Sequence, residues 1–586
     1  MTLPYRAPVP EMLFAMRELA KLDEVAALPG GGALDLELVR SILEQAALFA
    51  EEVLLPLNRS GDQNGARLEN GAVKTPPGFA HAYRKFVEAG WQTLAARPAH
   101  GGQGMPYLVA AAVNEMWAAS NLAFSLCLLA NENAAETLAR HASPELKQRY
   151  LGRIVKGEWT APMALTEPQA GSDLSLLRTR ALPDAGAYRL FGTKIFITYG
   201  EHDFTDNIVH LVLARLPDAP EGTRGLSLFL VPKFLVHADG SLGERNDVHC
   251  VSLEHKLGLR ASPTAVMAYG QKDGAVGYLV GEPNRGLEAM FVMMNRMRLG
   301  VGIEGLAMAE HAYQQARAYA RERVQGREPG AASGGAVPII RHPDVRRMLM
   351  EMKARIEAMR GLSYYAAARM DIAARHPDAA ERSAAQNRVD LLTPVIKGWQ
   401  TEQAQEIVSA ALQIHGGSGY VEETGVAQLL RDVRVTSIYE ATTGIQAADL
   451  TSRKVARDGG ATVARLASEA RAVCRALAGR QDDDRRAIAA RLDDAVRALE
   501  EATRYIVEHS ARAPANVAAG AVPYLMLLGS VAGGWQLARA ALVADEPSRA
   551  IVARYYAEHV LPRARAYADE VLFGADSVLR LDGERF

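Results

Sequence analysis

Hydrophobic positions recur at intervals of three and four residues near the start of the chain, as on the buried face of a helix. The stretch 34–57, "LDLELVRSILEQAALFAEEVLLPL", shows this pattern, and Asp35 suits its N-terminus. After the loop 101–106, "GGQGMP", the stretch 107–130 is largely apolar and favours a buried helical region. We therefore predict a helical domain over residues 1–160.

The hydrophobic pattern then changes to short runs of strand-forming residues that are separated by turns. No long helical pattern separates these runs, so parallel βαβ units are not expected. We predict a small antiparallel β domain over residues 161–282, either a sandwich or a barrel. The runs that carry this prediction are 187–200, 207–216, 225–234, 264–270 and 275–281.

Helical patterns return at 286 and continue to about 457, with the glycine-rich stretch 329–338 as a loop between helices. "RDGGAT" (457–462) is a candidate domain boundary, and the rest is again helical and rich in Ala and Arg. The predicted fold class is multidomain α+β. Its domains are an N-terminal helical domain (1–160), a β domain (161–282), a helical bundle (283–457) and a C-terminal helical extension (463–586).

One stretch of the extension, 517–534 ("VAAGAVPYLMLLGSVAGG"), is apolar enough to be considered as a membrane span. Pro523, the glycines and the nearby Arg539 favour a pair of buried helices instead. Contact with a membrane surface is the alternative that this stretch leaves open.

Charge and cysteine content narrow the class of protein. The 66 basic and 68 acidic residues give a net charge of −2, which argues against a dedicated nucleic-acid binder. The three cysteines are far apart and form neither a metal-binding pattern nor a disulfide framework, so we expect a reducing compartment and no metal. The start of the chain lacks a basic segment followed by an apolar core, so we expect no secretory signal and a cytoplasmic location.

Two short segments at the β domain could bind a flat, polar ligand. "ALTEPQAGSD" (164–173) is typical of a turn that offers backbone amides and hydroxyl groups to a ring edge or a phosphate, or of an ordinary turn. In "KIFIT" (194–198), Phe196 and Thr198 would share one face of a strand. That pair could pack against and hydrogen-bond a heterocycle, or simply belong to a half-buried strand.

Glycines and arginines of the helical bundle are equally ambiguous. The glycines of "QIHGGSGY" (413–420) follow a helical pattern, so they could cap a helix or let the backbone approach a ligand closely, and His415 is interpreted as structural. They are not a Rossmann turn, which would follow a strand. Arg323 could hold a phosphate or end a solvated helix, and the same ambiguity applies to Arg296 and Arg298.

A glutamate lies directly before a predicted helix in "SIYEATTGIQ" (437–446). Thr443 and Gln446 have the spacing of a capping box, so the helix should begin beside them. Taken alone, Glu440 could be no more than a favourable charge near the positive end of the helix dipole.

Together, the order and separation of these motifs resemble the acyl-CoA dehydrogenase family of flavoproteins over residues 40–456. "LTEPQAGSD" and "KIFIT" look like its two flavin motifs, and "ALQIHGGSGYVEE" looks like its Gly-Gly motif. "RDVRVTSIYEATTGIQ" resembles the segment that carries its catalytic glutamate. The length and the C-terminal extension are similar to a long bacterial sub-group, which includes 3-(methylthio)propanoyl-CoA and fatty acyl-CoA dehydrogenases.

The resemblance implies FAD-dependent α,β-dehydrogenation of an acyl-CoA thioester to a trans-2-enoyl-CoA. Glu440 would remove the α-proton while the β-hydrogen leaves as hydride to flavin N5, with FAD between the β domain and the helical bundle. An ordinary glutamate, with a pKa of about 4.3, is a weak base. We therefore expect apolar surroundings to raise the pKa of Glu440 toward the working pH.

Further site residues follow from matching the family motifs position by position. The flavin ring and nearby groups would be contacted by Thr166, Gly171, Ser172, Phe196 and Thr198. The pyrophosphate and adenosine of FAD, bound across a subunit boundary, would be contacted by Arg323, Gln413, Gly416 and Gly417. Thr442 would also reach FAD, and one of Arg296 and Arg298 would support the substrate segment.

The resemblance also implies a homodimer and electron-transfer flavoprotein as the electron acceptor. Among several departures from the family, Ala441 stands where glycine often follows the catalytic glutamate. Three other functions stay open: a flavin-dependent acyl-CoA oxidase, a DNA-binding relative, and a non-catalytic relative. The balanced charge of the C-terminal domain, with as many acidic residues as arginines in 471–586, speaks against DNA binding.

Overall fold

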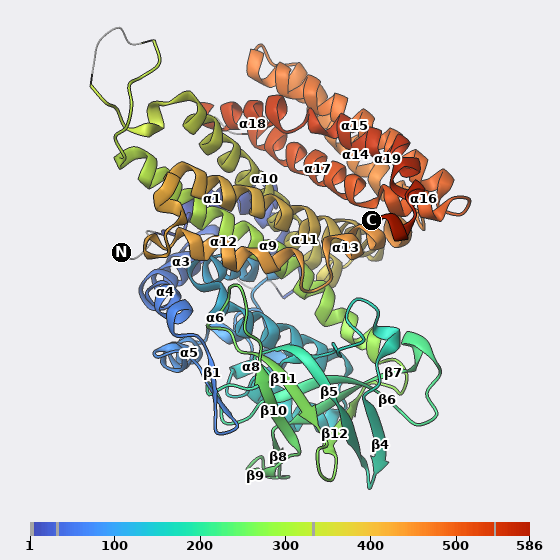
Figure 1. The fold of residues 1–586 in the computed structure, drawn as a ribbon. Coiled ribbons are helices and arrows are strands. Elements are labelled where there is room, and N and C mark those ends of the chain that lie inside the picture. Colours follow the sequence, from blue (N-terminus) through green and yellow to red (C-terminus); the bar gives the residue numbers. More distant parts are fainter. Residues whose placement is uncertain (1–4, 31–33, 331–334, 544–545) are drawn as a thin grey trace. The chain divides into compact units, whose positions relative to one another are not determined.

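The computed structural model describes residues 5–30, 34–330, 335–543 and 546–586, and it divides into two compact units (Figure 1). We call Leu48–Met105 with Ser120–Met297 the barrel unit, and Met1–Ala47 with Pro106–Ala119 and Arg298–Phe586 the helical unit. Three helices contribute residues to both units: α3 (Leu36–Phe49), α6 (Tyr107–His141) and α9 (Gly286–Glu322).

The sheet of the barrel unit closes on itself. Its pairing runs β5–β12–β7–β6–β4 and returns to β5, while β11 and β10 extend the sheet from β5. Neighbours are antiparallel except where β6 meets β3 and β4. The strands of this sheet are β3 (Met163–Ala164), β4 (Arg180–Asp184), β5 (Ala187–Thr198), β6 (Val209–Arg215), β7 (Leu226–Pro232), β10 (Val248–Leu253), β11 (Thr264–Tyr269) and β12 (Ala275–Val280). A separate hairpin pairs β8 (Phe234–Val236) with β9 (Leu242–Arg245).

The five strand runs predicted from the sequence correspond to β5, β6, β7, β11 and β12. Strands β6 and β7 are buried along almost their whole length, which explains their continuous apolar runs. Val212, Phe229 and Val231 pack with Leu190 of β5 in one core. The predicted β domain is thus confirmed, and of the two predicted forms it takes the barrel.

The sequence pattern predicted a region before the barrel that is helical throughout, and this prediction is wrong in one place. The region contains a small hairpin of β1 (Arg67–Glu69) and β2 (Ala72–Lys74). Helix α6 is interrupted at Asn121, whose side chain accepts a hydrogen bond from Phe124 N at 3.1 Å and so caps the second half of the helix. The remaining helices of the barrel unit are α4 (Leu55–Asn64), α5 (Phe79–Glu88), α7 (Pro144–Leu146) and α8 (Gly152–Lys156).

The helical unit is built around three long helices, α9, α10 and α11, followed by the C-terminal extension (Figure 1). Turns precede Ala461, where the first helix of the extension begins, and part of the predicted loop 329–338 lies outside the described residues. The predicted fold class is confirmed. The other helices are α1 (Val9–Phe14), α2 (Leu22–Ala26), α10 (Pro343–Arg375), α11 (Ala379–His415), α12 (Val426–Val433), α13 (Thr443–Asp449), α14 (Ala461–Ala478), α15 (Asp483–His509), α16 (Pro514–Ala519), α17 (Ala521–Val543), α18 (Pro547–His559), α19 (Arg563–Phe573) and α20 (Ala575–Arg580).

The apolar stretch 517–534 forms parts of α16 and α17. Among the described residues, α17 is the helix that is long and apolar enough to cross a membrane, yet 83% of its most apolar window is buried inside the protein. It packs against α15, α18 and α19 and also against α11 (Figure 1). At the contact with α11, a Cβ on Gly529 would lie 2.3 Å from Cγ of Trp399. Glycine is therefore needed there because the two helices approach closely.

We expect Gly529→Ala to lower the free energy of unfolding by about 1–3 kcal/mol, because the added methyl group overpacks the contact with Trp399. Denaturant unfolding followed by circular dichroism measures this change. Gly152→Ala is the matched control, since it adds the same methyl group to helix α8 where nothing lies within 4 Å. Equal effects of the two substitutions would contradict the close packing of α17 on α11.

Candidate active site

In the barrel unit, a buried ion pair joins the two segments that carry the predicted flavin contacts. Lys194 Nζ of β5 lies 2.9 Å from Glu167 Oε1 in the loop after β3, and it also donates to Leu165 O at 2.8 Å. The backbone reinforces this link, because Ile195 N donates to Thr166 O. Burial alone would raise the pKa of Glu167, but Lys194 and the Thr179 hydroxyl hold it at about 2. The pair is therefore ionised at neutral pH and fixes Thr166 beside β5.

Strand β5 contains a bulge at Phe196. The pairing with β11 shifts between Ala265 and Met267, so that β5 has one extra residue there. Phe196 has a φ of +59°, which is unusual for a bulky residue, and its side chain is 58% exposed. Ile197 is in the core, and Thr198 beyond it is half-buried. The strained backbone presents an aromatic ring outward, an arrangement that clusters at functional sites.

The loop after β3 leaves its small residues accessible. Gly171 and Ser172 are exposed, and a Cβ on Gly171 would meet nothing within 4 Å. Asp173 caps the following turn by accepting from Ser175 N at 2.9 Å. In the barrel unit, an exposed ring, hydroxyl groups and an open glycine turn are thus available to a flat polar ligand.

In the helical unit, Glu440 lies on the short connection before α13, as predicted. Glu440 and Ala441 have φ values of +53° and +74°, so two successive residues with side chains adopt the left-handed conformation. This conformation costs roughly 1–2 kcal/mol for a residue other than glycine. Glycine would suit the position of Ala441, which gives a physical reason for the family preference. Gln446 of α13 stabilises the turn, because its Nε2 donates a hydrogen bond to the backbone carbonyl of Glu440 at 3.1 Å.

The predicted capping box is wrong by one residue. Thr442, rather than Thr443, is the N-cap: its hydroxyl accepts a hydrogen bond from Ile445 N at 3.4 Å. Thr443 instead donates to Glu402 of α11 at 2.6 Å. Gln446 reaches back to Glu440 and not to the cap residue, so the box is replaced by a bond that supports the glutamate.

Two cations influence the half-buried Glu440. Burial raises the pKa of its carboxyl, while Arg298 of α9 and Lys397 of α11 act in the opposite direction. Arg298 also lies 3.8 Å from Asp449. Arg296, the other candidate for a substrate contact, instead pairs with Glu132 of α6 at 3.1 Å. Of the two arginines, Arg298 is therefore the one placed to act at Glu440.

Three residues beside Glu440 were missed by the sequence analysis. Glu304 of α9 is 3% exposed and accepts a hydrogen bond from the hydroxyl of Tyr439. Lys397 is fully buried in the middle of α11. A lysine within the apolar run "TPVIKGW" was the available signal, since a buried charge needs a reason. Glu304 and Tyr439 carried no comparable signal.

The residues predicted for the distal part of FAD lie at the ends of helices. Arg323 is exposed directly after α9, and Gln413 is exposed in the last turn of α11. Gly416 caps α11 with a φ of +61°, and Gly417 follows it; a Cβ on either would meet nothing within 4 Å. The capping role of Gly416 is confirmed, and the open space around both glycines also permits a ligand. His415 is structural, as interpreted: it is buried and bonded to Ala411 O at 2.7 Å.

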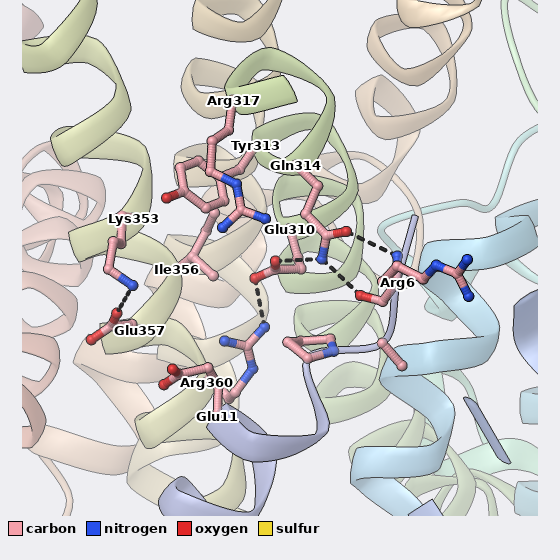
Figure 2. A pocket seen from close by; sticks show the side chains of 12 residues that line it. Arg6, Glu11, Glu310, Tyr313, Gln314, Arg317, Lys353, Ile356, Glu357 and Arg360 are labelled. Atoms are coloured by element: carbon pink, nitrogen blue, oxygen red, sulfur yellow. Dashed lines mark hydrogen bonds and ion pairs between the residues drawn. The ribbon is translucent and has the colours of Figure 1, made fainter. Parts of the chain in front are cut away.

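A cavity of about 220 Å³ lies elsewhere in the helical unit, between the N-terminal segment, α9 and α10 (Figure 2). Its carboxylates are engaged: Glu357 pairs with Lys353 at 2.7 Å, and Glu310 pairs with Arg360 at 2.8 Å. Gln314 closes one side by bonding both the N–H and the C=O of Arg6. None of the predicted site residues lines this cavity, and no group of three or more potential metal ligands occurs among the described residues.

Comparison with known proteins identifies the class. The models of the acyl-CoA dehydrogenase N-terminal, middle and C-terminal domains match residues 37–158, 162–270 and 284–455, and an acetyl-CoA dehydrogenase C-terminal-like model matches 464–582. The chain therefore belongs to the acyl-CoA dehydrogenase family, whose members use FAD.

Relatives of full length exist within this family. The 3-methylmercaptopropionyl-CoA dehydrogenase of Ruegeria pomeroyi is 46% identical, over 98% of this chain and 99% of the relative. The broad-specificity linear acyl-CoA dehydrogenase FadE5 of Mycobacterium tuberculosis is 33% identical, over 99% of this chain and 100% of the relative. The fold is similar to that of an acyl-CoA dehydrogenase complexed with FAD from Bacillus anthracis, with a TM-score of 0.75 at 18% identity over 99% of this chain and 94% of that one.

We expect Lys194→Met to lower the free energy of unfolding by about 3–5 kcal/mol, because Glu167 would be left buried without its charge partner. Adding Glu167→Gln should restore most of this loss in a double-mutant cycle measured by denaturant unfolding. The exposed pair Arg189–Asp184 of the same unit is the control, and Arg189→Met should cost about 1 kcal/mol or less. A loss that the second substitution does not repair would mean that Lys194 acts through packing alone.

We expect Glu304→Gln to change how stability depends on pH. Burial, the largest cause, raises the pKa of Glu304 from 4.5 to about 8. Its neutral form is therefore favoured in the folded protein, and the wild type should lose stability as the pH rises from about 4.5 to 8. The variant should not show this loss, so its stability relative to the wild type should increase across that window. Unfolding midpoints measured at several pH values test this, and a constant difference would show that Glu304 is ionised throughout.

Proposed function

We propose that Glu440 is the general base of this FAD-dependent acyl-CoA dehydrogenase. The single observation that carries the proposal is a carboxylate fixed in a strained turn, with a raised pKa and two cations nearby. A base for an α-proton needs a pKa near the working pH and must still be ionised there. Burial raises the pKa of Glu440, and Arg298 and Lys397 favour its ionised form, so both requirements are met.

The residues of each unit fit the demands of FAD. In the barrel unit, the exposed Phe196 suits a flat ring, and Thr166, Ser172 and Thr198 offer hydroxyl groups. In the helical unit, the open backbone at Gly416 and Gly417 suits close approach, and the exposed Arg323 and Gln413 suit phosphate and polar groups. When bound, FAD supplies the acceptor for the hydride that leaves the β-carbon. We assign Thr442 a further contact with this cofactor by its match to the family motif.

Residues of the chain accept the proton and stabilise the developing charge. The Cα–H bond of the thioester breaks and its proton passes to a Glu440 carboxylate oxygen. The electron pair left behind forms the Cα–Cβ double bond as hydride leaves Cβ, which gives a trans-2-enoyl-CoA. During this step negative charge shifts toward the thioester carbonyl, where fixed N–H donors stabilise it. Glu440 and Ala441 have positive φ values and lie outside a helix, so their N–H groups do not form helical hydrogen bonds. These N–H groups are the donors that we propose for the thioester carbonyl.

The proposed substrate is 3-methylmercaptopropionyl-CoA or a linear acyl-CoA of similar length. The support is the 46% identity over the full length to the Ruegeria enzyme named for that thioester, against 33% to the broad-specificity linear enzyme. The buried polar side chains of Glu304, Lys397 and Arg298 beside Glu440 also favour a short acyl group, because a long alkyl chain requires apolar walls.

We further propose a cytoplasmic homodimer that passes its electrons to electron-transfer flavoprotein. The support for the dimer is local: next to the open Gly416 and Gly417, the side chain of Tyr420 is 89% exposed and that of Val421 is 46% exposed. Apolar side chains exposed in this way are typical of an interface. A second copy could therefore cover this end of α11.

The test is anaerobic mixing of the FAD-loaded protein with acyl-CoA thioesters from short to long, together with 3-methylmercaptopropionyl-CoA. We expect one class to bleach the flavin absorbance and Glu440→Gln to slow this bleaching by at least about 10²–10⁴-fold. Glu423→Gln is the matched control, because Glu423 is an exposed glutamate in the turn Glu422–Thr424, outside the cluster around Glu440.

Bleaching that survives in Glu440→Gln would overturn the role of Glu440. Bleaching by no thioester would overturn the substrate class. Rapid reaction of the reduced flavin with oxygen would identify an oxidase in place of a dehydrogenase.

A further inference from the structure

Lys397 is a buried cation with no direct hydrogen-bond partner. Its side chain is fully buried in α11, and its Nζ makes no hydrogen bond within the described part of the chain. The neighbouring Gly398 and Trp399 pack tightly against α17, so the helix around it is fixed. A buried ammonium group without a partner is costly for folding. The structure therefore needs a reason, other than stability, for a charge at this position.

The charged groups around Lys397 come from α9, α11 and the turn before α13. Glu440, Glu304 and Glu402 attract it, and Arg298 repels it. Arg298 acts on Glu440 as well and also lies 3.8 Å from Asp449, and Glu402 is bonded to Thr443. On the side of the turn, Tyr439 neighbours Glu304, Glu440 and Asp432. Two carboxylates, Glu304 and Glu440, are thus left to compete for the lysine.

Burial and the nearby charge of Glu440 decide this competition, because both raise the pKa of Glu304, and they outweigh the opposite effect of the hydrogen bond from Tyr439. Glu304 is 3% exposed and its carboxylate oxygen Oε2 accepts from Tyr439, while Oε1 has no hydrogen-bond partner in the described chain. With a pKa of about 8, Glu304 holds its proton at neutral pH. Burial also lowers the pKa of Lys397 to about 8, so most of the lysine is still charged at pH 7. Glu440 is then the ionised carboxylate on which Lys397 acts.

We propose that Lys397 is a positioning residue for the proposed general base: its unshared ammonium charge keeps Glu440 ionised, and the buried Glu304 stays neutral so that it does not neutralise the lysine. This inference rests on the proposed role of Glu440. It assigns no contact with the substrate to Lys397. It states that the charge of Lys397 lowers the pKa of Glu440 and so opposes the increase that burial causes.

The expected consequence of Lys397→Met is a displaced acid limb in the pH–rate profile. An opposite charge nearby typically lowers the pKa of a carboxyl by about 1–3, so its loss should move the limb to higher pH by about one pH unit or more. Below the limb, the rate of flavin bleaching at saturating acyl-CoA should fall about tenfold for each pH unit by which the limb moves. The rate should recover at alkaline pH, and the concentration of acyl-CoA for half-saturation should change little.

The matched control is Lys353→Met, which removes a partly buried lysine beside Glu357 in the cavity of Figure 2. It should leave the acid limb in place. Glu304→Gln should also leave the limb within about 0.3 pH units of its wild-type position, because glutamine resembles a protonated glutamate. A limb that moves equally in Lys353→Met would overturn the specific role of Lys397.

A second readout uses the protein without cofactor or substrate. Because the pKa of Lys397 is lower in the folded chain than its usual 10.5, the wild type should gain stability relative to Lys397→Met as the pH rises from about 8 to 10.5. The variant should be at least as stable as the wild type at pH 7, since a buried charge has been replaced by an apolar side chain. A variant that fails to fold would contradict the proposal, because the lysine would then be needed for structure.

The two proposals can fail separately. Bleaching that persists in Glu440→Gln overturns the role of the base, whatever Lys397→Met does. If Glu440→Gln is inactive and the acid limb of folded, FAD-loaded Lys397→Met coincides with that of the wild type, the role of Lys397 alone is overturned.

Discussion

Glu440, the base that we propose, has to be shielded from water and yet remain ionised, and the residues around it in the helical unit act on these two demands in opposite directions. Shielding raises the pKa of Glu440, so that it becomes a stronger base. The same shielding favours the protonated form, which cannot act as a base. Cations on α9 and α11 oppose that tendency, and Gln446 holds the turn in a conformation that its residues would not adopt alone. Helix packing, backbone strain and charge placement are thus consequences of one requirement.

The two lysines that are buried among the described residues show how this requirement differs from ordinary stability. Lys194 in the barrel unit is fully bonded, to Glu167 and to Leu165 O, and it ties a loop to a strand. Lys397 in the helical unit has the same degree of burial but no hydrogen bond within the described residues. A structural charge is neutralised by its partner, whereas a charge that acts on a reactive group has to stay unshared.

The sequence was sufficient for the fold but not for the details of the site. Long helical patterns and short apolar runs predicted the domain order, and the family motifs singled out Glu440 as the candidate base. The cap was misplaced by one residue because Gln446 follows Thr443 at the spacing of a capping box, whereas it is the backbone of Thr442, with φ −61° and ψ 162°, that takes the cap conformation. The bulge at Phe196 could not be predicted, because alternation along a strand does not reveal an extra residue. Glu304 and Lys397 lie on separate helices, and only packing brings them to Glu440.

The close contact between α17 and α11 has a consequence for how the chain can be divided. Leu525 meets Gly398, and Trp399 meets Gly529 and Gly533, directly beside Lys397 in sequence. The C-terminal extension is therefore not a module that could be removed to leave a shorter enzyme of the same kind. Its removal would uncover a tryptophan and release the helix segment that bears the buried lysine. In this chain, the part farthest along the sequence from the predicted flavin motifs therefore supports the helix segment next to Lys397.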